Sequence, residues 1–372
     1  MMKTAYRRIR RYMPAVSLWL FLLTLPAAAL HMGFVFSPAF ADFFNERIAS
    51  FFRALFAHIT GWIPFSVAET LILFIPVIFA AVLVIAIRSA AKGWRRAMYC
   101  VLSLLSVIAL IYTMFAATFA AGYHGTPLAK KLNLERRDVS ALELAETAAI
   151  LATGMHENLE AVTFRYQDAS VMPYSYSEMS RKLMAAYDRV CEEYPFIQQL
   201  DSRIKPVTCS EPMTYTHISG VYTMFTGEAN LNVNYPDYVL PYTAAHELAH
   251  QRGVAREDEA NFVAFLVCMA SEDPYIRYSG YLNMYEYVSS ALYSASREYH
   301  GMIQGALDLR IYYELRAYST FFEKYRDTVI SDVSESVNNA YLVIQGTEGT
   351  KSYGMVVDLA VAYLLKNTEL QQ

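Results

Sequence analysis

The sequence has few charged residues, and those are unevenly placed. Only 18% of the 372 residues are Asp, Glu, Lys or Arg, whereas soluble domains average about 25%. Residues 1–120 carry 11 basic and 3 acidic side chains, and residues 121–372 carry 20 basic and 32 acidic ones. A basic, apolar front half is therefore joined to an acidic back half. A hydrophobic content of 55% excludes intrinsic disorder.

Cysteine, glycine and repeats are also scarce. Four cysteines are too few for a disulfide framework, although Cys191 and Cys209 could pair; free thiols are favoured. Fifteen glycines without a period exclude a collagen-like chain. A net charge of −4 gives no sign of nucleic-acid binding.

Three long runs without charge stand in the front half. They cover residues 14–36, 70–87 and 97–123, and spanning a bilayer takes about 20 apolar residues. With flanks, they predict membrane spans at about 14–36, 66–87 and 97–121, within a transmembrane region 1–123. Ser66 and Glu69 spell a capping box at the start of the second span.

Basic residues predict the orientation of these spans. Five lie before residue 12 and four in 88–96, but the first connection has only Arg47 and Arg53. The positive-inside rule then places the N-terminus and 88–96 in the cytoplasm and residues 124–372 outside the cell membrane. Alternatively, the first run is a signal peptide cleaved at the Ala39-Phe40-Ala41 site, which leaves the same domain outside.

Residues 42–60 predict an amphipathic helix. Its apolar stripe comprises Phe44, Ile48, Phe51, Phe52, Leu55 and Phe56. Two placements stay open: in the outer membrane interface, or packed on the soluble domain.

The back half, 124–372, predicts one mainly helical α+β domain. Helical periodicity dominates from about residue 140. Residues 203–235 are richer in β-branched and aromatic residues with turn glycines, which indicates a small sheet of two or three strands. The fold class is thus three transmembrane helices followed by a mainly α domain with a small sheet.

One segment carries chemistry: His246, Glu247 and His250 form H-E-x-x-H. On a helix, positions four apart face the same side, so both imidazoles can reach one metal ion with Glu247 beside them as a general base. Neutral imidazole and carboxylate are the usual ligands of catalytic zinc. We therefore expect Zn²⁺ as the cofactor and Glu247 as the catalytic residue.

A third ligand is expected on a second helix, at about 256–269. Glu257 and Asn261 share one face of that helix, whereas Glu259 lies on another face with apolar residues.

H-E-x-x-H followed by E-x-x-A-N resembles the gluzincin zinc peptidases. That resemblance implies a zincin-like fold, Glu257 as the third ligand and Asn261 as a brace for a ligand histidine. Only six residues separate His250 from Glu257, fewer than in thermolysin-like enzymes, so Glu259 stays an alternative ligand. The longer string HELAHQRGVAREDEANF resembles a bacterial membrane protein family of unknown function, over most of the chain.

The reaction implied is metal-assisted hydrolysis of a peptide bond. In related folds a strand before the motif pairs with the substrate backbone. The candidates here are Phe225, Gly227, Glu228, Ala229 and Asn230; an ordinary hairpin is the alternative.

Three functions compete. The first is a membrane-anchored zinc metallopeptidase acting outside the membrane on proteins, peptides or cell-wall peptides. The second is a zinc-bearing sensor or binding module without activity, which an intact Glu247 disfavours. The third, an intramembrane protease, is rejected because charged residues such as Arg252 and Glu257 flank the motif.

Overall fold

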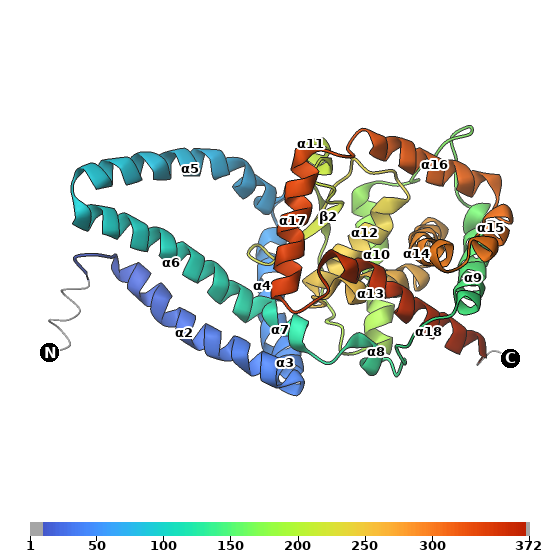
Figure 1. The fold of residues 1–372 in the computed structure, drawn as a ribbon, viewed down its shortest axis with the longest axis horizontal. Helices are drawn as coiled ribbons and strands as arrows, with labels where there is room; N and C mark the ends of the chain where they lie inside the picture. The colour runs from blue at the N-terminus through green and yellow to red at the C-terminus, as the bar shows by residue number, and fades with distance from the viewer. Residues whose placement is uncertain (1–9, 370–372) are drawn as a thin grey trace.

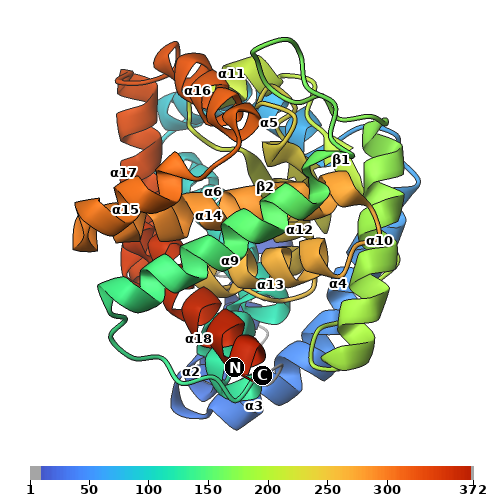
Figure 2. The same cartoon turned by 90° about the vertical axis from the view of Figure 1, so that its right-hand side faces the viewer.

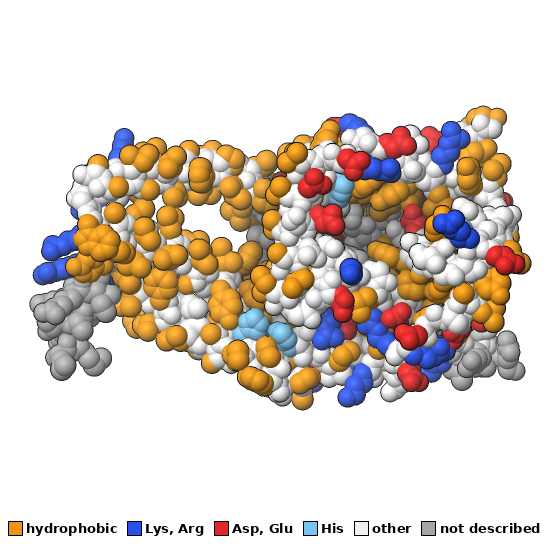
Figure 3. Space-filling model, viewed as in Figure 1, with side chains coloured by type: hydrophobic (Ala, Val, Ile, Leu, Met, Phe, Trp, Pro, Cys, Tyr) orange, Lys and Arg blue, Asp and Glu red, His pale blue; other side chains and the backbone are white. Residues whose placement is uncertain are grey.

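Three long apolar helices project from one side of the protein (Figure 1). The computed structural model describes residues 10–369. The three helices are α2 (Ala15–Phe36), α5 (Val67–Ala91) and α6 (Trp94–Thr118). Each is long and apolar enough to cross a membrane, and hydrophobic side chains cover this part of the surface (Figure 3). The prediction of three membrane-spanning segments is confirmed to that extent, with boundaries that differ by at most four residues.

The chain between the first two spans folds back onto the rest of the protein. It forms α3 (Pro38–Phe43), a π-helical turn η1 (Phe44–Ala49) and α4 (Ser50–Gly61). The polar side of α4 faces inward: Arg53 is 1% exposed. Its guanidinium donates to Asn45 Oδ1 at 2.8 Å and to the backbone oxygens of Asn45, Thr118 and Arg252. Phe51, Leu55 and Ile59 are exposed, so α4 packs on the rest of the protein by its polar side, and its placement in the membrane interface stays a prediction.

The N-terminus of the second span, α5, is hydrogen-bonded to the small sheet. Ser66 Oγ accepts the Glu69 backbone N–H at 2.9 Å, as the capping box predicts. The Glu69 carboxylate, however, accepts the backbone N–H groups of Thr208 and Cys209 instead of reaching back to Ser66. Glu228 Oε1 and Oε2 accept the first N–H groups of α5, from Val67 and Ala68, at 3.0 and 2.8 Å. Because Lys205 Nζ lies 2.5 Å from Glu228 Oε1, a buried ion pair ties this span to the sheet.

The sheet has three strands in the order β1-β3-β2. β1 (Ile204–Pro206) runs parallel to β3 (Glu228–Leu231), and β2 (Gly220–Thr223) runs antiparallel to it with Gly220 opposite Leu231. β3 is therefore the central strand, and β2 is an edge. The prediction of a small sheet within 203–235 is confirmed.

Helices make up the remainder of the protein. In chain order they are α7 (Ala120–His124), α8 (Leu128–Lys131), α9 (Ala141–Leu159), α10 (Tyr176–Glu193), α11 (Ser210–Thr214), α12 (Val239–Gln251), α13 (Glu257–Met269), α14 (Pro274–Ala295), α15 (Arg297–Gly305), α16 (Leu309–Glu323), α17 (Val329–Ile344), the 3-10 turn η2 (Gly349–Met355) and α18 (Val356–Glu369). Viewed end-on, α9, α13 and α14 lie in the middle, with α10 and α17 on opposite flanks (Figure 2).

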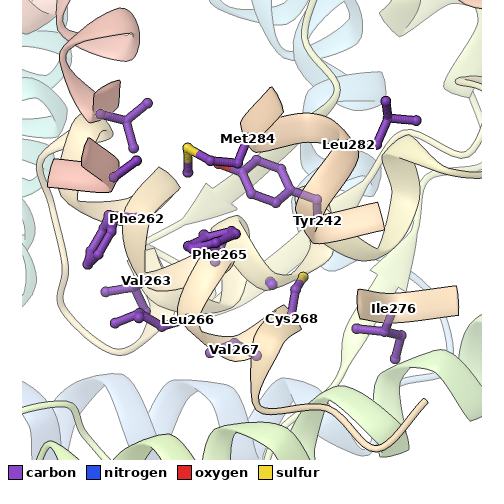
Figure 4. Packing of buried hydrophobic residues seen from close by; sticks show 14 of the residues in the cluster. Tyr242, Phe262, Val263, Phe265, Leu266, Val267, Cys268, Ile276, Leu282 and Met284 are labelled. Atoms are coloured by element: carbon purple, nitrogen blue, oxygen red, sulfur yellow. The ribbon is translucent and has the colours of Figure 1, made fainter. Parts of the chain in front are cut away.

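The main core surrounds α12 and α13. Tyr242 of α12, Phe262 and Phe265 of α13 and Met284 of α14 all belong to it (Figure 4). α12 is buried along its whole length. Full burial holds the motif rigidly, because a close-packed interior leaves side chains little freedom.

The contacts of the connecting segments show which ends of the three spans lie on the same side. α4, which follows the first span, contacts β3, and Tyr123 of α7, which follows the third, accepts hydrogen bonds from Arg256 just before α13. The connection 37–66 and residues 119–369 therefore lie on one side of the spans, and 88–96 lie at the opposite end. Which side is extracytoplasmic stays a prediction, as does the division at residue 123. All four cysteines are free, so Cys191 and Cys209 do not pair in this structure.

Candidate metal centre

α12 presents the three residues of the H-E-x-x-H motif. His246, Glu247 and His250 are each more than nine-tenths buried. The His246 and His250 rings meet edge to face, with centroids 4.5 Å apart. The helix ends at Gln251 with Arg252 as its C-cap, and Gly253 takes a φ of +92°, where a side chain would be strained. A Cβ on Gly253 would also lie 2.5 Å from the guanidinium of Arg53, so only glycine fits this turn.

α13 brings Glu257 against both histidines. Its Oε2 lies 3.2 Å from His246 Nε2 and 3.3 Å from His250 Nε2. One potential ligand atom from each of the three residues lies within 4.8 Å of the others, and this group is the one of its kind in residues 10–369. Three acidic residues open α13, where negative charge stabilises a helix N-terminus.

Glu259, the alternative ligand, lies elsewhere. Its carboxylate accepts the Leu128 backbone N–H at 2.8 Å and pairs with Arg256 at 3.4 Å. The structure therefore brings Glu257, and not Glu259, to the histidine pair.

The histidines are oriented for Nε2 coordination. His250 Nδ1 lies 2.7 Å from the Val254 carbonyl oxygen, so Nδ1–H donates there and Nε2 is the nitrogen that faces Glu257. His246 Nδ1 is buried without a hydrogen-bond partner among the described residues. Asn261, the predicted brace, donates its amide to Tyr287 Oη at 3.3 Å. Its bracing role stays a prediction.

Charge favours a cation at this cluster. Burial acts to lower the pKa of His250, but the Glu257 carboxylate outweighs it and raises that pKa to about 9. Burial opposes ionisation of Glu257, yet His250 and His246 hold the pKa of Glu257 well below its usual range. The proton on His250 thus occupies the place that a metal ion would take, and the donor set of two imidazoles and one carboxylate fits zinc. Glu257 Oε2 also has no hydrogen bond of good geometry among the described residues. A bond to a metal ion would satisfy this buried oxygen.

Glu247 stands between the histidines and strand β2. The Tyr222 backbone N–H donates to its carboxylate, while burial raises the pKa of Glu247 against the opposing effect of both histidines. A Cβ on Gly220 would lie 2.6 Å from Glu247 Cγ and 2.7 Å from Oε1. The missing side chain of Gly220 is therefore what lets Glu247 approach the strand.

A cavity of about 790 Å³ opens over His246 and Glu247. Its walls come from the segment before β2, from α14 and from α17, and include Asn283, Tyr287 and Asn338. No Lys or Arg lines it in the part of the chain that the structure describes. A cavity of this size can hold a short peptide segment.

The five predicted substrate-binding residues do not line this cavity. Glu228, Ala229 and Asn230 belong to the central strand β3, which is paired on both sides, and Glu228 is engaged with Lys205 and α5. Gly227 packs against α4, and Phe225 lies in the turn before β3. The cavity is instead lined by Ile218, Ser219 and Gly220, at the start of the edge strand β2. Of the two strands of this hairpin, β2 lies at the cavity and the predicted β3 does not.

A comparison with protein families finds one match. Residues 44–361, most of the chain, match a family described as "Protein of unknown function (DUF3810)". No curated protein and no solved structure matches the chain.

Proposed function

The chain belongs to the DUF3810 family, whose function is unknown, and we propose that it is a membrane-anchored zinc metallopeptidase with a zincin-like domain outside the cytoplasmic membrane. The observation that carries the proposal is the convergence of His246, His250 and Glu257 on one point beside the buried Glu247, with His246 and Glu247 lining a cavity.

Zinc, held by His246, His250 and Glu257, would supply Lewis acidity to a substrate carbonyl and to a water molecule. Glu247 accepts the proton of the attacking water and passes it to the leaving amine. Its raised pKa suits both steps, because the carboxylate must take a proton and then release it.

Tyr287 is our candidate for stabilising the oxyanion. Its Oη accepts from Asn261, so its own proton is available for a substrate oxygen. Burial raises the pKa of Tyr287, which keeps this proton in place at neutral pH.

The edge of β2 favours a peptide as substrate. Its outer side is not paired with another strand of the sheet, and Gly220 lies at both the cavity and Glu247. An extended peptide added to this edge would place a carbonyl beside the histidine pair. Proteins, short peptides and cell-wall peptides all present such a backbone.

The test compares the full-length protein with Glu247→Gln, both purified in detergent. Metal content is measured by mass spectrometry and cleavage on a broad peptide library. The wild type should hold one zinc and cleave, whereas Glu247→Gln should hold zinc and fail to cleave. Zinc in both proteins with cleavage by neither would refute the peptidase and favour the zinc-bearing binding module.

The location is tested separately. A reporter that is active only in the cytoplasm, fused after residue 372, should be silent. A strong signal would place the cavity in the cytoplasm.

A further inference from the structure

Helix α17 has two different long sides. Ser334, Glu335 and Asn338 line the cavity. The other side carries Ile330, Val333, Val337 and Ile344, each more than half exposed, which we call the outer face of α17. At 100° per residue the four outer-face positions fall within about 60° of one another. A soluble helix would not leave such a stripe in water.

The position of α17 indicates what covers this face. The helix lies at the boundary between the three spans and the rest of the protein and runs across their direction (Figure 1). Tyr341 joins it to the end of the third span: its Oη is 3.2 Å from Tyr123 Oη, and its ring packs against Phe115. α4 also presents exposed apolar side chains at this boundary, among them Phe51 and Ile59.

We propose that the outer face of α17 lies in the boundary between lipid head groups and acyl chains of the bilayer that the spans cross. The bilayer then supports one wall of the cavity from outside. α17 contains Asp332 and Glu335 and no Lys or Arg, so apolar insertion and not attraction to anionic lipid holds it there. The inference does not depend on peptidase activity.

The test uses tryptophan fluorescence in lipid nanodiscs. Trp19, Trp62 and Trp94 are the three tryptophans of the chain, and each is first replaced by Phe. Val337→Trp and Ile330→Trp then place a probe on the outer face, and Asp332→Trp places the matched control about 140° from position 337 on the same helix. Each variant must elute as the parent does in size exclusion, and two outer-face probes guard against misfolding of either.

Fluorescence is compared in phosphatidylcholine nanodiscs with and without bromine on the upper acyl chains. For a face inserted about 5–10 Å into the boundary, we expect at least a ~twofold loss at positions 337 and 330 and little change at 332. The same quenching should persist, without increase, when anionic phosphatidylglycerol is added. Absence of quenching at both outer-face positions, equal quenching at 332, or quenching that requires anionic lipid would each overturn the proposal.

Discussion

Replacing Glu257 by Gln tests the candidate metal centre most directly. The substitution keeps the shape of the side chain but removes its charge 3.2–3.3 Å from two imidazoles that are less than one-tenth exposed. Removing one partner of a buried charged group costs about 3–5 kcal/mol. At about 1.4 kcal/mol per factor of ten, zinc affinity should fall by roughly two to three and a half orders of magnitude.

The matched control is Glu259→Gln, two residues along the same helix and equally buried. Its carboxylate accepts the Leu128 N–H and pairs with Arg256, so the variant should lose about 1–2 kcal/mol of unfolding free energy and keep its zinc. Affinity is measured by competition with a chromogenic chelator. Zinc retained in Glu257→Gln and lost in Glu259→Gln would refute the arrangement.

The number of protons released when zinc binds tests the same substitution in a second way. His250, with a pKa of about 9, is protonated at pH 7.5 in the metal-free protein. Zinc binding must displace that proton, so calorimetry in buffers of different ionisation enthalpy should report about one proton released. Without the charge of Glu257 the pKa of His250 falls, and Glu257→Gln should release fewer protons.

Three further predictions concern the cavity and the core. Gly220→Ala pushes a methyl group into Glu247 and should lower kcat about 100-fold, as a misplacement of about 1 Å does, while zinc content measured by mass spectrometry stays unchanged. Tyr287→Phe should lower kcat by about 10²-fold or more with little change in KM if Tyr287 is the oxyanion donor; unchanged kcat would remove Tyr287 from that role. Glu314 is fully buried and burial raises its pKa to about 7, so its folded pKa exceeds its unfolded one and it destabilises the protein as pH rises from about 4.5 through 7. Glu314→Gln should reduce the fall in unfolding free energy over that range by about 2–3 kcal/mol, and urea titrations at pH 5 and pH 8 that show the same fall as the wild type would contradict this.

Local patterns predicted the spans and the motif helix. A span is recognised by length and apolarity alone, and H-E-x-x-H places its histidines by helical geometry, so neither needs knowledge of distant residues. The position of Glu257 also follows from local geometry, because helical phase already separates it from Glu259.

The edge strand and the cavity, which the sequence did not locate, depend on contacts between distant segments. The sequence shows a hairpin at 220–231 but not that β1 pairs with β3 and leaves β2 as the edge beside Glu247. The cavity walls come from α14 and α17, far along the chain from α12. Gly220 has no motif around it, and only its 2.6 Å approach to Glu247 identifies it.

The buried guanidinium of Arg53 determines where this chain can be cut. A fragment that starts at residue 124 would lose both Arg53, which donates to the Arg252 carbonyl, and Asn45, whose amide donates to the Gly253 carbonyl at 3.0 Å. Both carbonyls lie directly after α12, the helix of the H-E-x-x-H motif. The same cut removes Val67, whose backbone N–H donates to Glu228 at the start of α5, and Thr60, whose carbonyl accepts from Lys205. The part with the candidate metal centre therefore includes residues 37–68, and a soluble version needs this segment joined to residue 119 in place of the spans.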